Sequence, residues 1–379
     1  MKRLLVVLIV LMVSAALFAG GQQGSSGAAA GGGATLIGLA MPETHVERWV
    51  KDGSTLKAQA ESKGYRAEVA YADADQAKQN QQIGSFLTQG ARLLVVGQVN
   101  DGVASAVADA AKDGVAVIAY DRIIQNSADY DYYITFNNFK VGQFQGQGLE
   151  QGLNLKAATA ANPKYITFFA GSPTDGNAFF FFDGAMDILN PYIKSGVLKV
   201  VGPYPETSKD TANFQRIATE NWSAPIAKAR MENLLAGDAR DVTLDAVLAP
   251  NDTLARAIIE ALRADAKYAD KLPIVCGQDA EAASIASIRD GGQYVTVFKD
   301  TGKLAEAAII LADAILKGQT PSIPGAVLAS DIGLSSIGDT GKKTVKAYLL
   351  EPVMITRDNY KVPIDAGFYT AQEKSTYNF

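Results

Sequence analysis

The chain has 379 residues, which at ordinary domain sizes is enough for about two domains. Apolar residues make up 48% and charged residues 20%, a composition with ample material for a hydrophobic core, so intrinsic disorder is excluded for most of the chain. The net charge of -5 argues against a nucleic-acid-binding surface, and one Cys and one His exclude an intrachain disulfide and a Cys/His zinc cluster.

The first residues have the pattern of a secretory signal peptide. Two basic residues are followed by an apolar run over 4–18 and then by small residues. This run is too short for a transmembrane helix, which needs about 20 apolar residues, and no Cys follows it for lipid attachment. We therefore predict a signal peptide over 1–21, a flexible Gly/Ser/Ala linker over 22–33, and a periplasmic or extracytoplasmic protein whose fold begins near Ala34.

From residue 34 onward, apolar runs typical of buried strands alternate with amphipathic patterns typical of helices. The first runs predict strands over 34–41, 67–73, 92–99 and 115–121, with helices over 45–63, 75–89 and 102–113. The segment 132–138 has no helix before it and is predicted to lead to a crossing between domains. The later pattern predicts strands over 165–172, 197–204, 245–252, 272–279 and 294–300, and helices through about 195 and over 222–236, 253–267, 280–290 and 301–317. Apolar strands separated by helices indicate parallel sheets covered on both faces, and their number favours two α/β domains.

Polar side chains collect where these predicted strands end. The strand-end residues are Asp121, Arg122, Asp175, Asn177, Asn251, Asp252, Gln278, Asp279 and Lys299, and the first strand leads to Glu43, Arg48 and Trp49. In open parallel α/β sheets, ligands bind beyond the carboxyl ends of the strands. Carboxylates, amides and guanidinium groups match the vicinal hydroxyls of a sugar. The rings of Trp49 and Trp222 suit its apolar C–H faces.

Each of these residues also has a plain structural explanation. The alternatives are a helix N-cap for Asp252 and Asp279, an internal ion pair for Asp121 and Arg122, and packing for Trp49 and Trp222. Three further features are predicted to be structural: the run 179–182 as helix core, His45 as a surface residue near a helix start, and Cys276 as a buried thiol. Phosphate-binding, dinucleotide-binding and zinc-protease motifs are absent from the sequence, so no cofactor and no metal are predicted.

Seven sequence blocks, taken together, resemble periplasmic sugar-binding proteins of ABC transporters, in particular the multiple-monosaccharide-binding and xylose-binding groups. The blocks are AMPETHVERWVKDG, VIAYDRIIQNS, ITFNNFKVG, GSPTDGNAFFFFDGAM, WSAPIAKARMENLL, CGQDAE and VFKDT. The resemblance implies the type I periplasmic binding protein fold: two Rossmann-like, three-layer α/β lobes joined by a three-segment hinge. It places the first lobe at 34–137 and 300–325, and the second at 138–299 and 326–379.

The resemblance also implies a set of binding residues. Eight residues match positions that hydrogen-bond sugar hydroxyls: Arg48, Asp121, Arg122, Asp175, Asn177, Asn251, Asp279 and Lys299. Trp49 and Trp222 match positions that pack against the sugar ring, and Gln278 lies in one of the matching motifs. Two positions leave the ligand open between pentose and hexose. Phe182 stands where xylose-binding proteins tend to carry an Arg, whereas Asn251 is as in the xylose group.

The function implied is a monomeric, non-enzymatic receptor. It would capture an aldopyranose such as xylose, glucose, galactose or arabinose and deliver it to an ABC transporter permease, and signalling through a chemoreceptor or sensor kinase stays open. Two alternatives belong to other classes. A secreted glycosidase needs two carboxylates beside the scissile bond, which Asp121, Asp175 and Asp279 could supply. A transcriptional repressor of the same fold needs an N-terminal helix-turn-helix, where this sequence has the predicted signal peptide.

Overall fold

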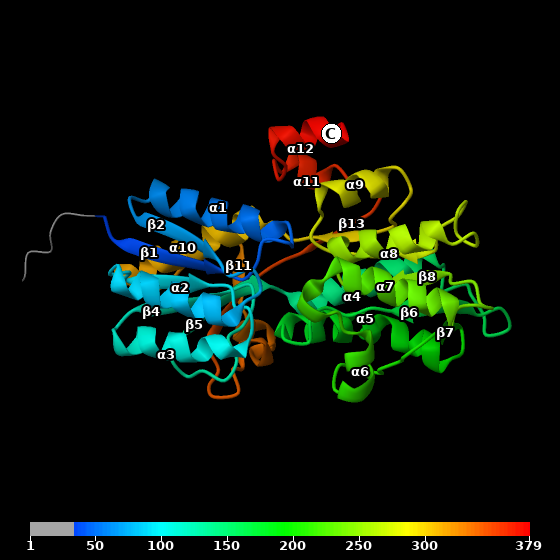
Figure 1. The fold of residues 1–379 in the computed structure, drawn as a ribbon, viewed down its shortest axis with the longest axis horizontal. Helices are drawn as coiled ribbons and strands as arrows, with labels where there is room; N and C mark the ends of the chain where they lie inside the picture. The colour runs from blue at the N-terminus through cyan, green and yellow to red at the C-terminus, as the bar shows by residue number, and fades with distance from the viewer. Residues whose placement is uncertain (1–33) are drawn as a thin grey trace, which may run out of the picture. The chain divides into compact units, whose positions relative to one another are not determined.

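The first of two α/β lobes is built around a seven-stranded sheet, in a computed structural model that describes residues 34–379 (Figure 1). Its strands, in spatial order, are β11 (Ala326–Leu328), β12 (Lys346–Leu350), β5 (Tyr132–Phe136), β4 (Ala116–Tyr120), β3 (Leu93–Val96), β1 (Leu36–Met41) and β2 (Arg66–Tyr71). Neighbouring strands are parallel except β11, which is antiparallel to β12. The predicted signal peptide and linker lie outside the described residues.

Helices cover both faces of this sheet. Helices α1 (Arg48–Ser62) and α10 (Thr301–Leu316) pack together. The other two are α2 (Gln76–Thr88) and α3 (Ala104–Lys112), of which α3 directly follows a short 3-10 turn at Asp101–Val103. Successive side chains of a strand point to opposite faces. In β1, Ile37 and Leu39 accordingly belong to one core cluster with Leu56 of α1, while Leu36 belongs to another with Phe86 of α2.

The second lobe has a four-stranded parallel sheet. Its strands, in spatial order, are β7 (Leu198–Val200), β6 (Lys164–Phe168), β8 (Ala246–Leu248) and β9 (Ile274–Val275). Its helices are α4 (Asn138–Gly152), α5 (Gly176–Lys194), α6 (Thr211–Ile217), α7 (Ala224–Ala236), α8 (Asp252–Ala264) and α9 (Ala282–Arg289). Helices α4 and α5 approach so closely that a Cβ at Gly142 would lie 2.0 Å from the carbonyl oxygen of Phe181.

Three crossings join the lobes. The chain passes from β5 to α4 at Asn137, from β10 (Thr296–Phe298) to α10 at 299–300, and from β12 to β13 (Val353–Ile355) at 351–352. Strands β10 and β13 pair antiparallel, and the chain continues into α11 (Val362–Asp365) and α12 (Ala371–Tyr377). The predicted fold class, two parallel-rich α/β lobes with a three-segment hinge, is confirmed.

The predicted lobe boundaries differ from the structure in one stretch. Residues 326–379 were all expected in the second lobe, yet β11 and β12 extend the first sheet, where β12 pairs with β5. The third crossing is therefore at 351–352 rather than before residue 326. The cause is that β12 completes the first sheet with a strand distant in sequence, which the local alternation of strands and helices does not reveal.

The structure also bears on the single thiol, on metal-binding groups and on membrane-spanning helices. Cys276 is fully buried, as predicted, and burial raises the pKa of its thiol to about 12. Within residues 34–379, no group of three or more His, Cys, Asp or Glu side chains is placed to hold a metal ion. In the same range, no helix combines the length and apolar character needed to cross a bilayer.

Candidate functional site

All eleven predicted site residues line a single cavity between the carboxyl edges of the two sheets. They are Arg48, Trp49, Asp121, Arg122, Asp175, Asn177, Trp222, Asn251, Gln278, Asp279 and Lys299. Val46 and Phe181 complete the lining. The cavity volume is about 20 Å³, room for roughly one water molecule. The side chains of the two lobes therefore lie nearly in contact across the site.

The fold explains this convergence, because the residues follow strand ends on facing sides of the two lobes. In the first lobe, Asp121 and Arg122 directly follow β4, while Arg48 and Trp49 open α1. In the second lobe, Asp175 and Asn177 follow β6, Asn251 follows β8, Gln278 and Asp279 follow β9, and Lys299 follows β10. Trp222 comes from a short 3-10 turn at Glu220–Trp222. Polar groups at the carboxyl ends of parallel strands are placed as the ligand sites of open α/β sheets are.

Arg48 links two buried carboxylates of the first lobe. Its Nη1 donates to Asp121 Oδ1 at 2.8 Å, and its Nη2 donates to Asp52 Oδ2 at 2.7 Å. Burial alone would raise the pKa of Asp121, but the guanidinium of Arg48 and the ammonium of Lys299 lower it below its ordinary value. Burial instead raises the pKa of Asp52. The Asp121 carboxylate is thus held ionised, as an acceptor facing the cavity.

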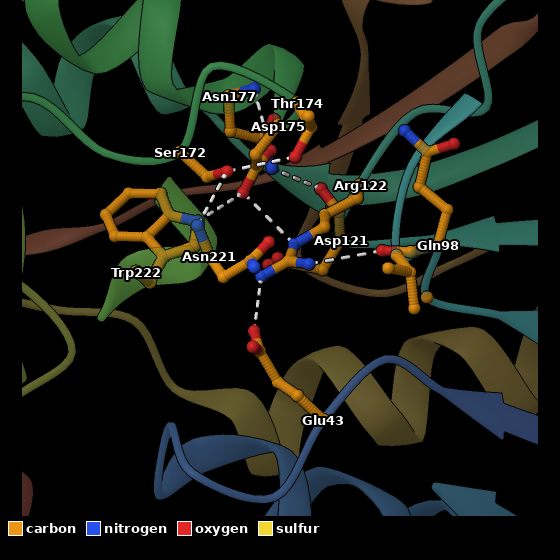
Figure 2. A network of polar contacts seen from close by, with 12 residues as sticks. Glu43, Gln98, Asp121, Arg122, Ser172, Thr174, Asp175, Asn177, Asn221 and Trp222 are labelled. Atoms are coloured by element: carbon orange, nitrogen blue, oxygen red, sulfur yellow. Dashed lines mark hydrogen bonds and ion pairs between the residues drawn. The ribbon is translucent and has the colours of Figure 1, made fainter. Parts of the chain in front are cut away.

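Arg122 joins the two lobes (Figure 2). Its Nη2 donates to Glu43 Oε1 at 2.7 Å and its Nη1 to the carbonyl oxygen of Gln98 at 3.1 Å. Its Nε lies 3.0 Å from Asp175 Oδ2, which also accepts from Trp222 Nε1 at 3.2 Å. Burial raises the pKa of Asp175, although the Arg122 guanidinium opposes the shift. The pair is an interlobe bridge inside the site.

The backbone at Asp121 adopts a left-handed conformation, with φ of 62°, which is uncommon for a residue other than glycine. Its carbonyl oxygen accepts from Tyr133 Oη at 2.7 Å, from Thr135 Oγ1 at 2.9 Å and from Asn177 Nδ2 at 2.7 Å. Its N–H donates to the carbonyl of Ile134 at 2.8 Å. A strained backbone of this kind persists only where the surrounding structure holds it in place, and these four hydrogen bonds hold Asp121 in this conformation.

The helix N-cap alternative, raised for Asp252 and Asp279, is wrong for both, because Asn251 caps α8 and Glu281 stands at the N-cap of α9. Two other site residues cap helices instead. Asp175 accepts from the backbone N–H of Asn177 at the start of α5, and Asn251 Oδ1 accepts from the N–H of Leu254 at the start of α8, at 3.0 Å in both cases. The cap fixes the Asn251 amide with its oxygen toward the helix. Its Nδ2 is therefore the group directed to the cavity.

Trp222 is fixed by its backbone and its neighbours. Asn221 and Trp222 both have positive φ, 51° and 53°, and the N–H of Asn221 donates to Ser172 Oγ at 3.2 Å (Figure 2). The indole meets the Phe181 ring edge-on at 6.4 Å. A Cβ at Gly171 would lie 2.1 Å from the indole, so this position requires glycine.

Trp49 provides the aromatic surface of the first lobe. The guanidinium carbons of Arg48 and Arg122 lie 4.8 and 4.9 Å from its ring centroid, and Tyr120 packs edge-on at 6.5 Å. Only 1% of Trp49 is exposed. The ring therefore positions both guanidinium groups through cation–π contacts.

The remaining pair belongs to the second lobe. Lys299 Nζ lies 2.9 Å from Asp279 Oδ1 and 5.3 Å from the ring centroid of Phe181. Gln278 is buried, and its Oε1 has no hydrogen-bond partner among residues 34–379. An unpartnered buried acceptor that lines a cavity is suited to a ligand hydroxyl.

Two residues at the site were not predicted as binding residues: Phe181, which lines the cavity, and Glu43, which pairs with Arg122. Phe181 was expected in the helix core, and its neighbour Phe182 does pack there, against Phe168 and Phe214. Within a helix, the spacing from Asn177 to Phe181 is one turn, so both face the same side. That spacing was the available signal for Phe181. Glu43 was noted after the first predicted strand, but its pairing with Arg122 could be identified only from the three-dimensional arrangement.

Comparison with known proteins gives the family. Residues 37–320 match the family model described as "Periplasmic binding protein domain". The chain is 39% identical over 341 residues to the multiple sugar-binding periplasmic receptor ChvE of Rhizobium radiobacter, covering 89% of this chain and 91% of that protein. It is 35% identical over 339 residues to the D-xylose-binding periplasmic protein of Haemophilus influenzae, covering 89% and 91%. An ABC transporter solute binding protein from Clostridium phytofermentans, solved with bound β-D-glucose, matches with a TM-score of 0.79 and 38% identity over 89% of this chain and 99% of that one. With this agreement in sequence and fold, the chain belongs to the periplasmic binding protein family.

Proposed function

We propose that this protein captures an aldose between its two lobes and delivers it to an ABC transporter permease. The observation that carries the proposal is the convergence of eleven polar and aromatic side chains, contributed by both lobes, on one cavity. The named ligands of related proteins, D-xylose and β-D-glucose, support the same class of ligand.

The charge arrangement favours a neutral, polyhydroxylated ligand. Each cation that lines the cavity is already paired with a carboxylate: Arg48 with Asp121, Arg122 with Asp175 and Lys299 with Asp279. A ligand therefore needs no charge of its own, and its hydroxyls can donate to the carboxylates while accepting from the cations. The indole rings of Trp49 and Trp222 would pack against the sugar ring.

Capture requires movement of the lobes. A cavity of about 20 Å³ is smaller than a monosaccharide, and Arg122 and Asp175 bridge it. The sugar would enter when the lobes are apart and would take over part of these contacts as they close. A ligand bound better by the closed form shifts the population toward that form. The hinge would be the crossings at Asn137, 299–300 and 351–352.

We propose further that the protein is a receptor and not a glycosidase. A glycosidase needs one carboxyl group that delivers a proton to the leaving group. Asp175 is the candidate because burial raises its pKa, but both of its oxygens already accept hydrogen bonds: Oδ1 from Asn177 N and Oδ2 from Trp222 Nε1. Its Oδ2 also lies 3.0 Å from Arg122 Nε, in an ion pair. Incubation with aryl glycosides of the bound sugar should release no phenol, and measurable release would contradict this assignment.

The predicted signal peptide over 1–21 supports export. A monomer with the ABC permease as its partner, and with a chemoreceptor or sensor kinase as an additional one, completes the proposal. Fractionation of cells that produce the full chain tests the first part: the protein should be found outside the cytoplasm, shortened at its N-terminus. A full-length cytoplasmic product would contradict export.

A thermal-shift screen of residues 34–379 tests the central proposal. Xylose, glucose, galactose and arabinose would each be added, with an acyclic polyol of the same length as the control. At a concentration of about 100 times its Kd, a ligand that binds only the folded state stabilises it by about 2.7 kcal/mol. At least one aldose should therefore raise the Tm. If no aldose does so, the proposed function is wrong.

A further inference from the structure

The segment 356–379, called here the C-terminal segment, packs on the second lobe beside the site (Figure 1). Tyr369 is buried in a small apolar cluster with Ala282 and Ile285 of α9, and Phe368 packs edge-on against Phe298 with ring centroids 4.9 Å apart. The segment thus contacts both the helix that follows Asp279 and the strand that precedes Lys299.

This segment holds the turn that carries Asp279. Asp279 and Ala280 have φ of 94° and 51°, a left-handed conformation that residues other than glycine adopt at a cost. The Tyr369 hydroxyl donates to the carbonyl oxygen of Ala280 at 2.6 Å. At the next residue, the N–H of Glu281 donates to Asp252 Oδ2 at 2.9 Å. The strained turn is therefore fixed by two separate contacts, one from the lobe itself and one from the C-terminal segment.

The same segment reaches the first lobe through Lys51 of α1. The ammonium of Lys51 donates to the carbonyl oxygen of Phe368 and lies 3.6 Å from the centroid of the Phe368 ring. Helix α1 also carries Arg48 and Trp49, so this contact joins the helix of one half of the site to the segment behind the other half.

The connection at Lys51 crosses a gap. A cavity of about 530 Å³ lies between α1 and the C-terminal segment, and its lining includes Lys51, Phe368, Arg48 and Asp279. The apolar cluster of the segment includes no residue of α1. A point contact of this kind can break when the lobes separate and form again when they close, without unpacking either lobe.

We propose that the C-terminal segment stabilises the closed, sugar-bound state: Tyr369 is a positioning residue for Asp279, and Lys51 ties the segment to α1. This inference rests on the proposed function. Its consequence is that both residues slow the release of sugar although neither lines the sugar cavity.

Two matched pairs of variants test the proposal, with the aldose found by the thermal-shift screen as ligand. Lys51→Met removes the ammonium but keeps an apolar side chain, and Lys57→Met on the exposed face of the same helix is its control. Tyr369→Phe removes only the hydroxyl, and Tyr360→Phe in the same cluster is its control. Stopped-flow fluorescence gives the dissociation rate, calorimetry gives the Kd, and the Tm of the sugar-free protein reports folding.

We expect Lys51→Met to weaken binding about 3- to 30-fold through faster release, and Tyr369→Phe to weaken it about 2- to 10-fold. The sugar-free Tm of Lys51→Met should stay at the wild-type value, and the controls should bind as wild type does. Wild-type Kd and release in Lys51→Met would overturn the proposal, as would equal losses in the control variants. If Tyr369→Phe does not fold, Lys51→Met alone decides.

The two proposals fail in different ways. If the wild-type protein binds an aldose and Lys51→Met behaves like it, only the role of the C-terminal segment is wrong. If the wild-type protein binds no aldose, the proposed function itself is wrong, and the inference that rests on it falls too.

Discussion

The carboxylate of Asp121 is placed by its backbone as much as by its ion pair. Four hydrogen bonds hold its main chain in a left-handed conformation, and Arg48 holds its side chain. One of the four comes from Asn177 of the second lobe. Because a flexible acceptor would lose entropy on binding, this fixed geometry favours affinity.

Replacing Asp121 should therefore weaken sugar binding with little change in the fold. Asp121→Asn keeps the shape but removes the charge that pairs with Arg48, which should cost about 1.5–3 kcal/mol, or roughly a 10- to 100-fold higher Kd. Calorimetry with the identified aldose measures the loss. Asp113→Asn, at an exposed position after α3, is the control and should bind normally. An unchanged Kd in Asp121→Asn would remove this carboxylate from the site.

His45 is exposed and lies just before α1, as predicted, and it also contacts the second lobe. Its Nε2 is 2.9 Å from Glu43 Oε2 and 2.8 Å from the carbonyl oxygen of Asn221 in the second lobe. The hydrogen bond to the Glu43 carboxylate raises the pKa of His45, while partial burial and, to a smaller extent, the Arg122 guanidinium oppose this. The protonated imidazole is therefore favoured in the folded protein.

This raised pKa predicts the sign of a pH effect. The stabilisation is fully present below the unfolded-state pKa of about 6.5 and is lost as the pH rises through the higher folded-state pKa. The free energy of unfolding of wild type minus that of His45→Gln should thus decrease as the pH rises through this window. Since His45 is the only His of the chain, no other imidazole contributes. A difference that does not change with pH would contradict this account.

Residue-scale prediction worked where one local rule sufficed. Polar residues at the ends of parallel strands converge, and Asp121, Arg122 and Asp279 were predicted on that basis and line the cavity. Their role toward a sugar stays a prediction. The supporting residues were beyond such a rule: the carboxylate of Glu43 meets Arg122 across 79 positions of sequence, a pairing that depends on the tertiary arrangement.

At the scale of elements, most helices and strands were predictable because their apolar periodicity is local. The expected helix over 301–317 is α10, Thr301–Leu316, and the expected strand over 34–41 contains β1, Leu36–Met41. Strand β12 was not predicted, although all residues after its first are buried. No adjacent helix in the sequence marks it, and its partner β5 lies more than two hundred residues earlier.

Two glycines in helices should respond in opposite ways to the same substitution. Gly84 of α2 is exposed, with no atom within 4 Å of an added Cβ, whereas a Cβ at Gly142 of α4 would lie 2.0 Å from the Phe181 carbonyl oxygen. Gly84→Ala should raise the free energy of unfolding by about 0.5–1 kcal/mol, since alanine loses less backbone entropy. Gly142→Ala should lower it, because α4 and α5 must separate, at a cost of about 1–3 kcal/mol. Urea denaturation measures both, and stabilisation by Gly142→Ala would contradict the close helix contact.

At the scale of the whole molecule, the two lobes meet through polar contacts at the site. Arg122 pairs with Asp175, Asn177 donates to the Asp121 carbonyl, and His45 contacts the Asn221 carbonyl. Buried ion pairs gain little net stability over the separated, hydrated ions. The closed arrangement can therefore depend on a ligand that satisfies both sides at once.

The three crossings provide the means for the lobes to move. Each is a short connection between an element of one lobe and an element of the other, at Asn137, 299–300 and 351–352. Hinge closure concentrates its backbone changes in a few such residues. The lobes themselves, each a sheet with packed helices, would move as rigid units.

Closure should be visible as a change in size when the sugar binds. Small-angle scattering of residues 34–379 should show a smaller radius of gyration at saturating aldose than without it, because the ligand stabilises the closed population. Asp175→Asn removes the carboxylate that Arg122 pairs with across the cleft, so this variant should need more sugar to reach the same radius. An acyclic polyol at equal concentration controls for solvent contrast and should leave the radius unchanged. If the radius stays constant while calorimetry shows saturation, the lobes do not close on the ligand, and the sugar is held by the residues of one lobe alone.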